Sequence, residues 1–182
     1  MWSVPTPTAL CGSNAIARAL DLDRRSADRL VAAGLLGETF ETERGVYVHP
    51  NDVQELGATR WVDSHPDALV IRLGAVQTAP NAEGRPFLGW HSDLAKADWA
   101  TQLCAIDRWW AVRDPEPGLA VVFTVSTFVV HVATLAGSVV GPGGLRILEF
   151  AKQAKAEQTK AFVGQRVYTG RGGNTVWLTA QS

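Results

Sequence analysis

The 182-residue chain has little cysteine, and its charges nearly cancel. Cys11 and Cys104 are its two cysteines, and neither belongs to a metal-binding or redox motif. We therefore expect two free thiols in a reducing compartment. The formal net charge is −1, so no excess of positive charge on the whole chain indicates a nucleic-acid partner. Only a local patch of charge could do so.

Signals for export or membrane insertion are also missing. Residues 1–5 contain no basic stretch followed by an apolar run, which predicts that the chain has no signal peptide. The long apolar stretch 119–140 is rich in Val and is interrupted by Thr, Ser and His. That composition favours buried strands over a membrane-spanning helix. We therefore expect a cytoplasmic protein with no membrane partner.

No pattern in the sequence defines a metal site, a cofactor site or a catalytic group. The four histidines are not spaced with one another, or with Cys or carboxylates, as metal ligands would be. His91, Ser92 and Asp93 are consecutive, but Ser92 is better explained as a helix cap than as part of a catalytic triad. We expect no metal and no cofactor.

Two helical patterns separated by a short turn occupy the first part of the chain. Apolar residues recur at helical spacing in 13–22 and again in 21–36. Asp23 is placed to cap the second helix and Gly34 to end it. A polar turn and a short strand follow, and Pro50 suits the first turn of a third helix.

This order of helix, turn, helix, hairpin and helix resembles the winged helix-turn-helix DNA-binding domain of excisionases and MerR-type regulators. The resemblance covers about a quarter of the chain. The residues that match the family pattern are Ile16, Ala17, Leu20, Leu22, Ala27, Leu30, Gly34, Leu36, Val46, Val48, Asp52, Val53 and Leu56.

The resemblance implies that the second helix enters the major groove of double-stranded DNA and that the wing contacts the backbone. The outward residues of the reading helix would be Arg24, Arg25, Ser26, Asp28 and Arg29, and Arg44 is the basic residue of the wing. Arginine suits this role because its fork can bind guanine or phosphate in two places.

The charge of this segment leaves a second interpretation open. Residues 13–57 contain five basic and eight acidic residues, a net charge of −3. The wing carries Glu41 and Glu43, which should weaken attraction to phosphate. A winged helix that contacts protein instead of DNA is therefore a rival hypothesis.

The composition changes after residue 57, and we predict two domains. Residues 1–62 would form the winged helix-turn-helix domain, and residues 63–182 an α+β domain with a small, mostly antiparallel sheet and one or two helices. Helices are expected at 93–112 and 151–163. The second domain would supply a further DNA contact, a ligand site or a surface for a homodimer.

The clearly positive region of the chain is residues 145–173, with six basic and two acidic residues and a net charge of +4. The residues that we expect to contact the DNA backbone there are Lys152, Lys155, Lys160, Arg166 and Arg171. Trp90 and Trp109 lie off the apolar helical stripe, and we consider them for base stacking or ligand binding. Packing in the core is the alternative for both.

A looser pattern supports an enzyme as the alternative. Arg72, the aromatic segment 87–92, the segment 124–128 and then Glu149 or Glu157 resemble the order of residues in ADP-ribosyltransferase-like NAD-binding folds. That resemblance implies an NAD-using enzyme with an accessory winged helix. The function that we prefer is sequence-specific DNA binding, in transcription regulation or in phage or mobile-element biology, and the enzyme stays open as the alternative.

Overall fold

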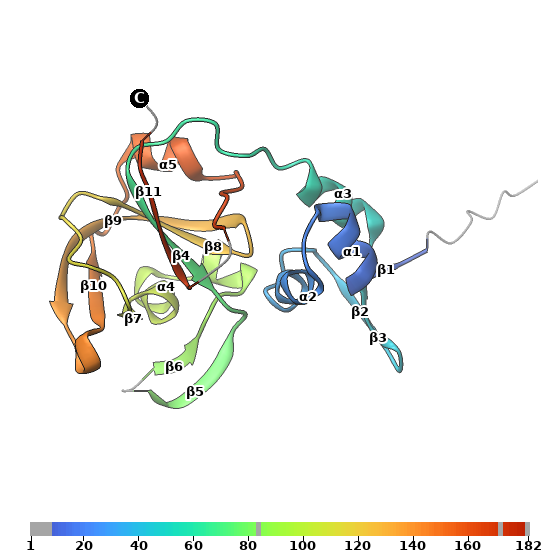
Figure 1. The fold of residues 1–182 in the computed structure, drawn as a ribbon. Helices are drawn as coiled ribbons and strands as arrows, with labels where there is room; N and C mark the ends of the chain where they lie inside the picture. Colours follow the sequence, from blue (N-terminus) through green and yellow to red (C-terminus); the bar gives the residue numbers. More distant parts are fainter. Residues whose placement is uncertain (1–8, 83–84, 171–172, 181–182) are drawn as a thin grey trace, which may run out of the picture.

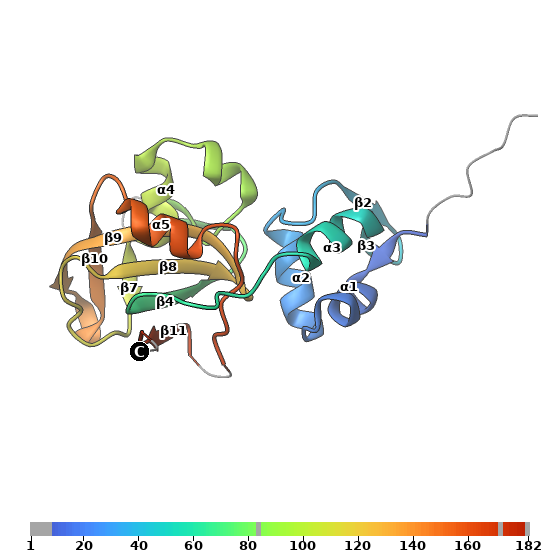
Figure 2. The same cartoon turned by 90° about the horizontal axis from the view of Figure 1, so that it is seen from above.

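The computed structural model describes residues 9–82, 85–170 and 173–180. They form two units that lie side by side, with helix α2 of the smaller unit facing the larger one (Figures 1 and 2). Within these ranges, no helix is long and apolar enough to cross a membrane.

The N-terminal unit combines three helices with a small antiparallel sheet of order β1-β3-β2. Its elements are β1 (Cys11–Gly12), α1 (Ser13–Leu20), α2 (Arg24–Ala32), β2 (Thr39–Thr42), β3 (Gly45–Val48) and α3 (Pro50–Gly57). Asp21 adopts a left-handed conformation, with φ of 53°, and ends α1. Asp23 then caps α2 by accepting a hydrogen bond from the backbone N–H of Ser26.

The C-terminal unit is built on a six-stranded sheet of order β11-β4-β8-β9-β10-β7. Its elements are β4 (Ala68–Leu73), β5 (Gln77–Ala82), β6 (Arg85–Leu88), the 3₁₀ helix η1 (Ser92–Lys96), α4 (Trp99–Ile106), β7 (Arg108–Trp110), β8 (Ala120–Val125), β9 (Phe128–Val140), the 3₁₀ helix η2 (Pro142–Gly144), β10 (Arg146–Phe150), α5 (Ala156–Phe162) and β11 (Thr175–Leu178). Only β4 and β8 pair in parallel among its described strands. The predicted α+β class and the mostly antiparallel sheet are confirmed.

Strands β4 and β8 are apolar apart from Arg72 and Thr124 because both faces of the sheet are covered there. Residues 121, 123 and 125 contribute to one buried cluster, and residues 120 and 122 to a second cluster that includes Phe162 of α5. The apolar stretch 119–140 is the hairpin of β8 and β9, turning at Ser126, whose φ is 58°. The interpretation of this stretch as strands is confirmed.

The prediction of a single helix over residues 93–112 is wrong. Asp98 interrupts it and caps a new helix, because its carboxylate accepts a hydrogen bond from the N–H of Thr101 at 2.8 Å. The chain after Ile106 then pairs with β10 as strand β7 instead of continuing the helix. Propensity favoured a long helix, and a local cap and long-range strand pairing overrode it.

Helix α2 is fastened to the C-terminal unit near both of its ends. The Ser126 hydroxyl donates to the backbone oxygen of Ser26 at 3.0 Å. The N–H of Ser92 donates to the backbone oxygen of Ala33 at 2.8 Å. Buried residues of both units also belong to one hydrophobic cluster. The two units on either side of the connecting segment 58–67 therefore share packing.

Arg166 forms a second connection between the units. Its side chain is 6% exposed and lies between the rings of Trp61 and Phe128, with its guanidinium carbon 4.2 and 4.6 Å from their centroids. Nη2 donates to the backbone oxygen of Leu20 at 3.1 Å, and Nε donates to the Thr127 hydroxyl at 3.2 Å. Burial lowers the pKa of Arg166, and the charge of nearby Asp21 partly offsets that effect.

His131 on β9 is surrounded by aromatic rings, and its burial gives a testable dependence of stability on pH. Its ring centroid lies 5.8 Å from that of Trp90 and 5.9 Å from those of Trp99 and Phe123. Desolvation lowers the pKa of His131 below its ordinary value of 6.5. The unfolded chain therefore binds a proton more readily than the folded chain, and stability is lost as the pH falls below about 6.5.

Replacement of His131 by Phe is expected to make the loss of stability between pH 7.5 and 5.5 shallower, because the proton acceptor is removed. Urea unfolding at the two pH values measures this, with exposed His49→Asn as the matched control. An equal loss in wild type and His131→Phe would contradict the assignment.

Candidate nucleic-acid interface

Three arginines from separate elements meet on one concave surface of the N-terminal unit, which we call the arginine groove. Arg18 comes from α1, Arg24 from the start of α2 and Arg44 from the turn between β2 and β3. The groove encloses about 370 Å³. It is lined by Gly12, Ser13, Asn14, Ala15, Arg18, Arg24, Arg44, Gly45, Val46 and Tyr47. None of these lining residues is acidic.

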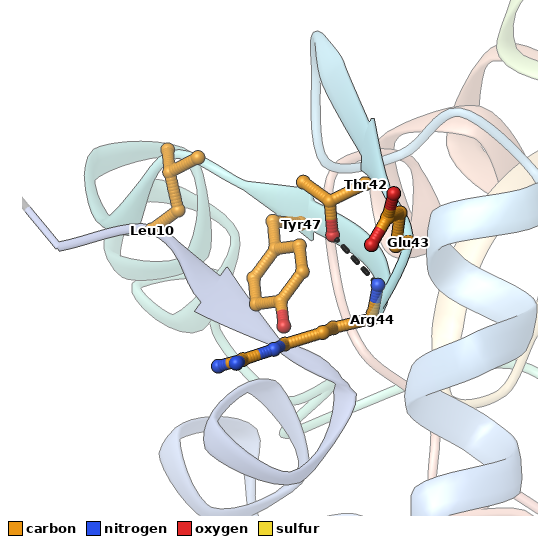
Figure 3. Close-up of a pocket in the computed structure, with 5 residues that line it drawn as sticks. All are labelled: Leu10, Thr42, Glu43, Arg44 and Tyr47. Atoms are coloured by element: carbon orange, nitrogen blue, oxygen red, sulfur yellow. Dashed lines mark hydrogen bonds between the residues drawn. The ribbon is translucent and has the colours of Figure 1, made fainter.

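The β2–β3 hairpin fixes the position of Arg44. Thr42 and Gly45 are paired, so the turn between them has two residues. The Thr42 hydroxyl accepts from the N–H of Arg44 at 3.2 Å and donates to the oxygen of Gly45 at 3.1 Å. Figure 3 shows the Arg44 side chain running past the hydroxyl end of Tyr47, whereas Glu43, which lines the same hollow, points away from the Arg44 guanidinium. The open hollow in that view, of about 530 Å³, adjoins the groove through Arg44 and Tyr47.

The start of α1 adds a second source of positive potential. Gly12 is the residue before the helix, and it offers no side-chain acceptor to the first N–H groups. Those groups, at Ser13, Asn14 and Ala15, belong to residues that line the groove. A helix N-terminus with unsatisfied N–H groups attracts anions.

The acidic residues that give residues 13–57 their negative net charge do not line the arginine groove. Glu41 and Glu43 of the wing do not line it, although they weigh in the net charge of residues 13–57. Arg24 lies 4.0 Å from Asp28 in an exposed pair. Such a surface contact contributes little and leaves the arginine available for another partner. The local charge of the surface is therefore opposite to that of the segment.

The residues predicted to read DNA on α2 are divided between two surfaces. Arg24 lies in the arginine groove. Arg25, Ser26 and Arg29 instead line a cleft of about 840 Å³ between α2 and the C-terminal unit, which we call the inter-unit cleft. The described residues that line it are Asp21, Leu22, Asp23, Arg25, Ser26, Arg29, Trp61, Arg72, Ser126, Thr127, Tyr168, Thr169 and Gly170.

The basic segment predicted at 145–173 is not brought to the arginine groove. Lys152, Lys155 and Lys160 are exposed on and just before α5, which lies far from the β2–β3 turn in both views (Figures 1 and 2). The prediction of a phosphate contact fails for Arg166, because its guanidinium is buried between two rings. Arg171 lies outside the described residues.

The two tryptophans considered for stacking are used in packing. Trp90 is 1% exposed, which leaves no ring face for a base or a ligand. Trp109 is half-buried and lies over Gly141, where a Cβ atom would come within 2.0 Å of its ring. Trp90 is therefore a core residue, as the alternative prediction stated, and the Trp109 ring covers the backbone at Gly141.

The residues of the enzyme alternative are brought together only in part. Arg72 on β4 pairs with Thr124 on β8, and Arg72, Ser126 and Thr127 line the inter-unit cleft. Neither carboxylate joins them: Glu149 lies on β10, and Glu157 lines a different hollow beside Lys160. Within the described ranges, no cluster of His, Cys, Asp or Glu is arranged to hold a metal ion.

Arg18 is the site residue that sequence reasoning missed. It lies on the exposed side of α1, where its Nε donates to the backbone oxygen of Asn14 at 3.3 Å. The sequence contained one signal for Arg18. It lies four residues after Asn14, so both residues are on the same side of α1. Comparison with protein-family models, with curated proteins and with solved structures finds no match. The function is therefore inferred from the site itself.

Proposed function

We propose that the N-terminal unit binds double-stranded DNA as a winged helix-turn-helix, with Arg18, Arg24 and Arg44 on the phosphate backbone. The observation that carries the proposal is the arginine groove, where three elements each supply one arginine and none of the described lining residues is acidic. Arginine binds phosphate through two parallel hydrogen bonds, and neutralising phosphates releases counterions.

The order of elements supports the same proposal. A three-residue turn joins α1 to α2, the β2–β3 hairpin follows, and α3 completes the unit. In winged helix-turn-helix proteins the second helix reads bases and the wing touches the backbone. Arg24 is the residue of α2 that lines the groove. We therefore expect it to contact a phosphate and to lie next to the bases that the second helix reads. A role in transcription regulation or mobile-element biology follows from sequence-specific binding.

Selection of bound sequences from a random duplex pool, at low and at moderate salt, tests this function. We expect one motif to be enriched at both salt concentrations. Binding without a motif at low salt alone would reduce the function to non-specific attraction. Absence of binding at low salt would overturn the proposal and favour protein contact through the same surface.

A further inference from the structure

The inter-unit cleft is a second candidate site, and neither DNA binding nor the fold accounts for its lining. It lies between α2 and the ends of the parallel strands β4 and β8, where Arg72 and Ser126 are found. Its volume of about 840 Å³ matches that of small-molecule sites.

Positive charge enters the cleft from α2. Arg25 and Arg29 are one helical turn apart, and both side chains are exposed. Arg72 stabilises the opposite wall, because its Nη2 donates to the backbone oxygens of Thr169 and Gly170. Three arginines from two units therefore lie around one hollow.

Asp21 and Asp23, the carboxylates among the described lining residues, both interact with other groups of the protein. Asp23 accepts hydrogen bonds from the N–H and the hydroxyl of Ser26, at 2.8 and 2.9 Å. These bonds, and more weakly the charge of Arg29, lower the pKa of Asp23. Asp21 lies near the charge of Arg166. Both carboxylates stay charged, but the described lining still carries three arginines against two carboxylates, a net formal charge of +1.

Flat apolar surfaces accompany this charge. Tyr168 is 75% exposed and Trp61 is 43% exposed, and both line the cleft. One face of Trp61 is covered by Arg166, whereas Tyr168 has no such cover among the ring contacts of the described residues. Exposed aromatic rings next to arginines suit a ligand that carries both an aromatic ring and an anionic group.

We propose that the inter-unit cleft binds a nucleotide, with its phosphates on Arg25 and Arg29 and its base against Tyr168. The ligand would contact α2 and the C-terminal unit together and so hold α2 in the docked position. Its effect on DNA binding rests on the function proposed above, whereas the binding site does not. Nucleotide and DNA affinity would then be coupled reciprocally.

Calorimetric titration of the full chain with ADP, pyrophosphate and adenosine tests the site. We expect ADP to bind, and we expect replacement of both Arg25 and Arg29 by Gln to weaken ADP at least tenfold. Tyr168→Ala should weaken ADP and leave pyrophosphate unchanged. Lys96→Gln with Arg113→Gln removes the same charge from exposed positions outside the cleft and should not alter binding.

Absence of ADP binding, or equal ADP affinity in wild type and the Arg25, Arg29 variant, would overturn the proposal. Equal affinities for pyrophosphate and ADP would overturn the assignment of the base to Tyr168. The triple variant Arg18→Gln, Arg24→Gln, Arg44→Gln separates the two functions: loss of DNA binding with retained ADP binding supports both sites. ADP binding in a wild-type chain that binds no DNA would refute the DNA proposal alone.

Discussion

Replacing Arg18, Arg24 and Arg44 together by Gln is expected to flatten the salt dependence of DNA affinity by about 2.7 on a log–log scale, because each phosphate contact contributes about 0.9. Affinity should fall for every sequence, since phosphate contacts carry no sequence information, and loss of Arg24 should also weaken the preference for any base that it contacts. The three side chains line one groove and none is buried in the core, so thermal stability should stay near that of wild type. Fluorescence anisotropy at several salt concentrations measures the slope.

A second variant with Lys152, Lys155 and Lys160 changed to Gln is the matched control, because it removes the same charge from exposed positions on and beside α5. The sequence predicts that this basic segment contributes more to the salt dependence than Arg44 does. The arrangement of the units leads us to expect the reverse, with little change in slope for the lysine variant. A wild-type slope in the arginine variant would refute the groove, and a larger effect of the lysines would place the phosphate contact on the C-terminal unit.

Replacing Arg166 by Ala is expected to lower the free energy of unfolding by about 2.5–5 kcal/mol, the sum of a lost hydrogen bond from a charged group at about 1.5–3 kcal/mol and two cation–π contacts at about 0.5–1 kcal/mol each. The substitution leaves the backbone oxygen of Leu20 without its partner across the joint between the units. The rings of Trp61 and Phe128 lose the group that lies between them. Because buried residues of both units belong to one hydrophobic cluster, unfolding should remain a single transition.

Two further variants show whether the effect belongs to the joint. Arg166→Lys keeps the charge but loses the planar fork, so it should recover only part of the stability. Arg113→Ala removes an exposed arginine and should change the free energy of unfolding by less than about 0.5 kcal/mol. Urea unfolding measures the free energy of unfolding of each variant. If Arg166→Ala were as stable as Arg113→Ala, Arg166 would not connect the two units.

The sequence by itself determined several local elements of this protein, although not the break at Asp98 or strand β7. Helical spacing of Ile16 and Leu20, the cap at Asp23 and Pro50 at a helix start each correspond to an observed helix. The Val-rich run 119–140 predicted strands and forms β8 and β9. These features depend on residues within one or two turns of each other, so their periodicity is visible in the chain.

Only the tertiary structure decided which charges are available at a site. Arg166 counted as a surface cation in the basic segment, but its guanidinium binds the oxygen of Leu20, 146 residues away. Arg24 and Arg25 are neighbours in sequence, yet they line different surfaces because successive helical residues point about 100° apart. The docking of α2 against the C-terminal unit then turned the side with Arg25 into a cleft. Net charge counted along the chain cannot distinguish these outcomes, because burial and convergence depend on contacts between distant segments.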